Sequence, residues 1–164
     1  MGIAFCRVNR RGQPDYRPER QRHHLLPMAL FRRKQFRQFF ADLAPVGFTF
    51  DDFATNGLLL PTTEIEALRW GMPLHRGPHP RYNALILMRA ENIRATYAWS
   101  RRRFWDRLDC LQRLRLLQNA VRRALLGSSA FPVSLHQRDP MRSRLDFGTI
   151  DEMIEKAWAY SKVG

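Results

Sequence analysis

The sequence predicts an α+β fold that is mostly helical and contains two short strands. Apolar residues recur at helical spacing over three long stretches, residues 28–43, 82–99 and 103–126. Two short apolar runs, at 23–26 and 58–60, are each stopped by a proline, which is typical of short strands. A chain of 164 residues is long enough to bury a core, so we expect one domain over 1–164.

The first third of the chain combines an irregular arm with a helix. Residues 1–21 contain two prolines that oppose a helix, and we expect an arm with a short strand at 3–8. The next stretch, 28–43, is expected to be one helix, ended by a proline and a glycine. Its apolar face is formed by Phe36, Phe39, Phe40 and Leu43.

Two local signals organise the middle of the chain. Asn56-Gly57 predicts a turn that leads into the second strand. Thr63 and Glu66 have the spacing of a capping box, so a short helix is expected from there to about Trp70.

The second half of the chain is expected to be helical. Proline is favoured at the first helical position, so Pro80 opens a helix with His79 at its cap, and the apolar side continues to about Trp99. A further helix is expected over 103–126, and a last one over 149–160.

The charge indicates a nucleic-acid partner. The chain has 28 basic and 15 acidic residues, a net charge of +13, and only three of the basic residues are lysines. The guanidinium group suits bidentate phosphate contacts. Codon usage can explain part of the arginine-to-lysine ratio but not the net charge. The basic excess flanks a neutral middle, residues 51–100, which contains His75 and His79.

Several other classes of protein fit poorly. No apolar run has the length of a membrane span, and no cleavable signal peptide is seen. Cys6 and Cys110 are too few for a disulfide scaffold or a zinc ribbon, so two free thiols are expected.

Four of the five histidines form two motifs, the doublet His23-His24 and the pair His75 and His79. Imidazole can act as a general base or bind a transition metal. Neighbours on a strand point in different directions, so one member of the doublet can face a metal and the other a water. Each motif alone is more often structural, but their combination within sixty residues favours a hydrolytic site.

The arrangement resembles the AHH family of toxin nucleases, in the HNH or His-Me finger superfamily. The resemblance covers about residues 20–100. It rests on Arg22-His23-His24-Leu25-Leu26-Pro27, on Asn56-x-Leu58-x-Leu60-Pro61, and on His75-Arg76-Gly77-x-His79-Pro80-x-Tyr82-Asn83. Arg22 stands where the family motif has alanine.

The resemblance implies a ββα-metal finger, two strands and a helix around one divalent ion, surrounded by additional helices. The core would span 22–100, including a helical insert, and 101–164 would be a helical extension. The implied roles are general base for His24, metal ligands for His23, His75 and His79, and a tether that orients His24 for Asn56. The DNase colicins have a similar order of motifs.

The implied reaction is hydrolysis of a phosphodiester bond. A divalent ion (Mg²⁺, Zn²⁺, Mn²⁺ or Ni²⁺, with the identity open) would contact the phosphate and the leaving 3′ oxygen, while His24 takes a proton from water. Arginines near the site or on the outside of the later helix would hold phosphates without reading sequence. These candidates are Arg22, Arg76, Arg81, Arg103 and Arg107.

The first expectation is therefore a DNA endonuclease of low specificity, acting as an antibacterial toxin. An RNase of the same fold, or a non-enzymatic nucleic-acid binder with a structural metal, stays open. A structural zinc site built from histidines alone would be unusual. A toxin implies a cognate immunity protein, which the charge predicts to be acidic. We expect a delivered effector that acts in the cytoplasm of a target cell.

Overall fold

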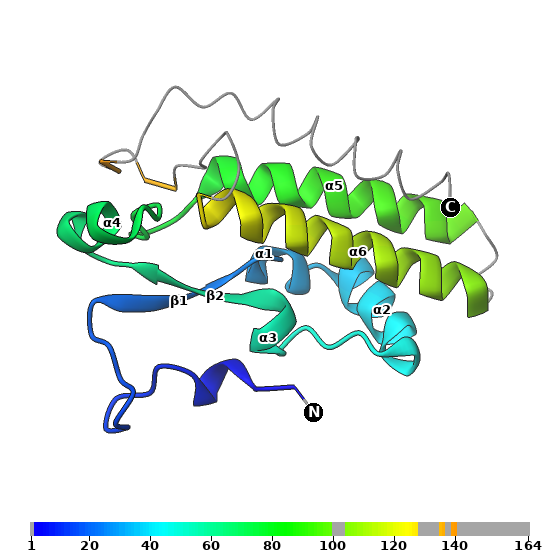
Figure 1. Ribbon diagram of the computed structural model, residues 1–164. Coiled ribbons are helices and arrows are strands. Elements are labelled where there is room, and N and C mark those ends of the chain that lie inside the picture. The colour runs from blue at the N-terminus through cyan, green and yellow to red at the C-terminus, as the bar shows by residue number, and fades with distance from the viewer. Residues whose placement is uncertain (1, 100–103, 128–134, 137–138, 141–164) are drawn as a thin grey trace.

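The computed structural model describes residues 2–99, 104–127, 135–136 and 139–140 (Figure 1). The expected fold class is confirmed, because a two-stranded sheet is surrounded by helices. The prediction of a short strand at 3–8 is wrong. That segment forms a 3-10 helix, η1 (Phe5–Arg7). Its strand-like pairing in the described structure is limited to one isolated bridge, between Ala4 and Asp52.

The sheet pairs β1 (Arg20–His24) with β2 (Gly57–Pro61) in antiparallel register, with His23 opposite Leu58 and His24 opposite Gly57. Both strands were expected from their sequence. β1 begins earlier than the apolar run and ends at His24. The next backbone N–H, at Leu25, still donates to the carbonyl of Asn56 at 2.8 Å, but Asn56 belongs to a helix and β2 begins only at Gly57. The doublet therefore lies at the end of β1.

The helix expected over 28–43 is broken into α1 (Met28–Phe31) and α2 (Lys34–Leu43). Arg33 has extended backbone, with φ −84° and ψ 130°, which interrupts the helical hydrogen bonds. The expected apolar face of α2 is buried. A short 3-10 helix, η2 (Ala44–Val46), ends at Gly47, whose φ of 97° is left-handed and favours glycine.

Asn56-Gly57 leads into the second strand as expected, but it is not a turn. Asn56 is the last residue of a short helix, α3 (Phe53–Asn56), which is capped by the side chain of Asp52 and runs directly into β2. Gly57 has an ordinary φ of −115°, so glycine is needed here because it lacks a side chain and not because of its backbone conformation. A Cβ atom there would lie 2.2 Å from the ring of Phe53.

The remaining helices follow the prediction within one or two residues. They are α4 (Glu64–Trp70), α5 (Pro80–Trp99) and α6 (Phe104–Leu125). Thr63 caps α4 by accepting a hydrogen bond from the N–H of Glu66 at 3.3 Å. The helix expected over 149–160 lies outside the described residues.

Helices α5 and α6 lie side by side and antiparallel, and α2 packs against α6 (Figure 1). One buried apolar cluster joins the apolar faces of these three helices. It also includes Leu58 and Leu60 of β2, and Leu25 and Leu26, which follow β1. The N-terminal arm lies on the opposite side of the sheet from α5 and α6 (Figure 1). In the described part of the chain, no helix has the length and apolar character needed to cross a membrane. Both cysteines are free thiols, as expected.

Candidate active site

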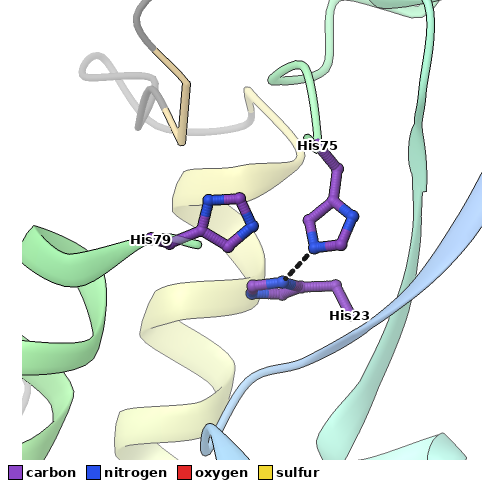
Figure 2. A group of neighbouring side chains, drawn as sticks. All are labelled: His23, His75 and His79. Atoms are coloured by element: carbon purple, nitrogen blue, oxygen red, sulfur yellow. Dashed lines mark hydrogen bonds between the residues drawn. The ribbon is translucent and has the colours of Figure 1, made fainter. Parts of the chain in front are cut away.

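His23, His75 and His79 converge on one point, as Figure 2 shows. His23 comes from β1, His75 from the loop between α4 and α5, and His79 from the start of α5. One nitrogen from each ring can be chosen so that all three lie within 4.8 Å of one another. His23 Nδ1 and His75 Nε2 are 3.0 Å apart and share a hydrogen bond. The three metal ligands expected from the sequence are therefore together.

Local hydrogen bonds explain how three separate elements meet. The backbone N–H of His75 donates to the carbonyl of Pro61 at 2.8 Å, which ties the loop to the end of β2. The carbonyl of His79 accepts the first hydrogen bond of α5, from Asn83 at 2.9 Å. Because β2 is paired with β1, the loop, the helix and His23 are held in one place.

The outer nitrogens of two of these histidines have partners. His79 Nδ1 donates to the carbonyl of Leu135 at 2.9 Å, and His75 Nδ1 donates to Gln21 Oε1 at 2.9 Å. In a neutral ring, a proton on Nδ1 leaves a lone pair on Nε2. Both Nε2 atoms can therefore face the centre of the cluster as ligands. Within the described residues, the buried Nε2 atoms of His23 and His79 make no hydrogen bond.

The electrostatics favour neutral imidazoles. Burial lowers the pKa of all three rings, and for His23 the neighbouring His75 and His79 lower it further. The pKa of His75 is about 4. Neutral imidazole is the form that binds metal. Three nitrogen ligands with an open position are typical of catalytic transition-metal sites, so the residues fit a divalent ion.

His24 does not join the cluster, because neighbours on a strand point to opposite faces. Its ring stacks on Phe5, with ring centroids 3.7 Å apart and planes 2° apart, and faces Phe50 at 5.8 Å. Burial lowers the pKa of His24, Arg22 lowers it further, and Asp51 opposes both. The ring is half-buried and available in its neutral form.

Asn56 is fully buried at the junction of α3 and β2. Its Oδ1 accepts from the N–H of Leu26 at 2.7 Å and from Gln118 Nε2 at 3.1 Å, and its Nδ2 donates to the carbonyl of Phe50 at 3.0 Å. These bonds join the end of β1 to the segment before α3 and to α6. These contacts are of the kind expected of a residue that tethers the loop. That Asn56 orients His24 stays a prediction.

The candidate arginines fall into two groups. Arg76 and Arg81 are exposed and adjoin His75 and His79 in the chain. Arg22 is exposed as well. Two of these three arginines already donate to a backbone carbonyl, Arg22 to Phe5 at 2.6 Å and Arg76 through Nε to Thr62 at 2.8 Å.

Of the other two candidate arginines, only Arg107 is among the described residues. Arg107 is near the start of α6, where it donates to the hydroxyl of Tyr97 at 3.4 Å, at the opposite end of α5 from His79. Arg103 lies outside the described residues. The phosphate contacts expected of Arg107 on the outside of α6 stay a prediction.

Sequence reasoning missed several residues around the site. Gln21 could have been found, because it is two residues before His23 and so shares its face of β1. Phe5, Leu135 and Gln118 are far away in the sequence and left no local signal. Tyr82 packs beneath the site, with its hydroxyl donating to the carbonyl of Leu25 at 2.6 Å.

Two antiparallel strands, a helix and three converging imidazoles define this site as a candidate ββα-metal centre. A model of the AHH family, described as a nuclease family of the HNH/ENDO VII superfamily with a conserved AHH, matches residues 6–120. The chain therefore belongs to the AHH nuclease family and acts on nucleic acid. No curated protein and no solved structure matches it. Arg22 precedes the histidine doublet where the family motif has alanine.

Proposed function

We propose that this nuclease hydrolyses DNA phosphodiester bonds with the help of a divalent metal ion. The observation that carries the proposal is the convergence of His23, His75 and His79 from three separate elements, with their ligand atoms within 4.8 Å (Figure 2). Two of these rings have outer hydrogen bonds from Nδ1, which place the lone pair on Nε2, the nitrogen that faces the centre of the cluster. In a family of nucleases, such a cluster is best explained as the metal site.

The roles of the residues follow from their chemistry. His23, His75 and His79 hold the ion, which supplies positive charge at the scissile phosphate and the leaving oxygen. His24 is the general base, because its lowered pKa keeps it neutral and able to accept a proton from water. Arg76 and Arg81 are exposed beside two of the ligands and hold neighbouring phosphates.

We expect low sequence specificity. Arginines bind phosphates at every position of a duplex alike, and a net charge of +13 attracts any nucleic acid. The same features would also serve an RNase, so RNA is the alternative substrate.

The proposed biological role is that of an antibacterial toxin, delivered into the cytoplasm of a target cell. A cell that produces such a nuclease needs an inhibitor. The charge of +13 predicts that this immunity protein is acidic, because complementary potentials accelerate association and select the partner.

The test is cleavage of supercoiled plasmid, with a labelled single-stranded RNA in a parallel reaction. Protein stripped of metal should leave the plasmid intact, and added Mg²⁺, Mn²⁺, Ni²⁺ or Zn²⁺ should restore nicking that EDTA abolishes. Nicking at full rate in EDTA would contradict the metal requirement. Cleavage of the RNA with an intact plasmid would contradict DNA as the substrate.

A further inference from the structure

The ring of Phe5 covers one face of His24. The two rings are parallel within 2° and 3.7 Å apart between centroids, which is full stacking contact. Phe50 lies on the same imidazole at 5.8 Å with an interplanar angle of 24°. Phe5 is only 6% exposed, although it belongs to an N-terminal arm whose other described residues are exposed or half-buried. The imidazole plane of His24 is therefore fixed by two phenylalanine rings.

The arm is attached to the body at Ile3 and at Phe5. The N–H of Phe53 donates to the carbonyl of Ile3 at 2.7 Å, and the N–H of Ile3 donates to Asp52 Oδ1 at 3.1 Å. The N–H of Phe5 donates to the carbonyl of Asp51 at 3.3 Å. The ring of Phe5 also meets Phe53 edge-on at 5.1 Å. These contacts hold Phe5 at a defined place.

Arg22 adds a contact that the family's alanine could not make. Arg22 and His24 are two residues apart on β1, so their side chains leave the same face of the strand. The guanidinium of Arg22 donates to the carbonyl of Phe5 at 2.6 Å. The arginine that replaces the family's alanine thus contacts Phe5, the residue that stacks on His24. Phe5 itself lies outside the matched residues 6–120.

We propose that Phe5 and Arg22 are positioning residues that hold His24 in the orientation needed to take a proton from water. This inference rests on the proposed function, in which His24 is the base. A general base must lie within hydrogen-bond reach of the proton that it removes. Stacking blocks rotation of the imidazole ring but leaves the nitrogens at its edge unobstructed, so Phe5 orients the ring without consuming its lone pair.

The test uses paired variants of the full chain with plasmid as substrate. Phe5→Leu and Arg22→Met should each lower kcat, by about 10- to 100-fold for a misplaced base, with Zn²⁺ affinity unchanged. Phe5→Trp keeps a stacking ring and Arg22→Lys keeps a donor, so both should retain most of the activity. Arg11→Met, in an exposed part of the arm, controls for the loss of one positive charge.

A double-mutant cycle separates positioning from phosphate binding. If Arg22 acts through Phe5, the double variant Phe5→Leu/Arg22→Met should be no slower than Phe5→Leu alone. If the two losses multiply, or if Arg22→Met raises KM alone, the positioning role of Arg22 is wrong.

Proton NMR gives a readout that does not depend on activity. The ring current of Phe5 should shift the His24 ring protons upfield in the wild type, and Phe5→Leu should abolish that shift. An unshifted His24 signal in the wild type, or an unchanged or increased kcat in Phe5→Leu, would overturn the inference. Absence of cleavage by the wild type with any metal would instead overturn the proposed function.

Discussion

At the scale of single residues, the chemistry of the site depends on which nitrogen of each histidine carries the proton. The carbonyl of Leu135 can only accept, so His79 must donate from Nδ1 and keep its lone pair on Nε2. Gln21 gives His75 the same tautomer through Oε1. Partners of this kind raise the basicity of the ligand and fix its orientation.

Replacing Gln21 with methionine should weaken metal binding. The side chain keeps its length but loses the acceptor for His75 Nδ1, and losing such a partner typically costs about 10- to 100-fold in metal affinity. Gln21→Glu should bind at least as tightly as the wild type, because a carboxylate is a stronger acceptor. Calorimetric titration with Zn²⁺ measures both. The matched control is Gln13→Met, in an exposed turn of the arm, and equal affinities of Gln21→Met and the wild type would contradict the role.

The histidines could be identified from the sequence because imidazole chemistry leaves a signature in residue type and spacing. His23, His75 and His79 meet as expected. The residues that orient them could not be identified in the same way. Leu135 acts through a backbone carbonyl, which every residue possesses, and Phe5 resembles any other apolar residue. Only the folded chain brings them to the histidines.

At the scale of elements, the junction between α3 and β2 holds the site together. Asn56 ends α3, and its side chain bonds to the backbone beyond β1 and to Gln118 in the middle of α6. Gly57, the next residue, lies against the ring of Phe53 too closely for any side chain. One buried amide therefore connects the sheet to the helical layer.

Asn56→Ala should destabilise the fold. The N–H of Leu26 and the amide of Gln118 would lose their acceptor in a buried place, and an unsatisfied buried group costs about 1–3 kcal/mol. We expect a loss of about 2 kcal/mol or more in the free energy of unfolding, measured with urea. Asn92→Ala, on an exposed position of α5, is the control and should stay within about 0.5 kcal/mol of the wild type. A similar loss in both variants would contradict the tether.

The long helices, the capped helix α4 and both strands were predictable, whereas α3 and the break between α1 and α2 were not. α5 and α6 show several turns of apolar periodicity, and Thr63 and Pro80 mark helix starts by capping chemistry. α3 has only four residues, which is too short for a helical repeat of apolar residues to be recognised in the sequence. The break at Arg33 lies inside an otherwise regular apolar pattern, which contains no proline or glycine that would have signalled it.

At the scale of the whole molecule, the site extends past the part of the chain that defines the family. The match covers 6–120, whereas Phe5 touches His24 and Leu135 touches His79. Segments before and after the match thus contribute to the surroundings of the histidines. The expected division into an arm, a core over 22–100 and an extension over 101–164 stays a prediction.

Binding to DNA should depend steeply on salt, because the net charge of +13 acts through phosphate contacts. The cleavage-deficient His24→Ala variant should lose at least about 10-fold in affinity between low and physiological salt, alike for unrelated duplexes. Arg76→Met and Arg81→Met should each reduce the slope of log K against log salt by about 0.9. Fluorescence anisotropy measures the slopes. Unchanged slopes would exclude both arginines from phosphate contact.

The most direct test of the central claim compares His79→Ala with His24→Ala in two assays, Zn²⁺ titration and metal-supported plasmid nicking. If the histidines have separate roles, His79→Ala should lose both metal binding and nicking. His24→Ala should bind the metal like the wild type and nick about 10²- to 10⁴-fold more slowly. Wild-type metal affinity in His79→Ala, or wild-type nicking by His24→Ala, would contradict the account.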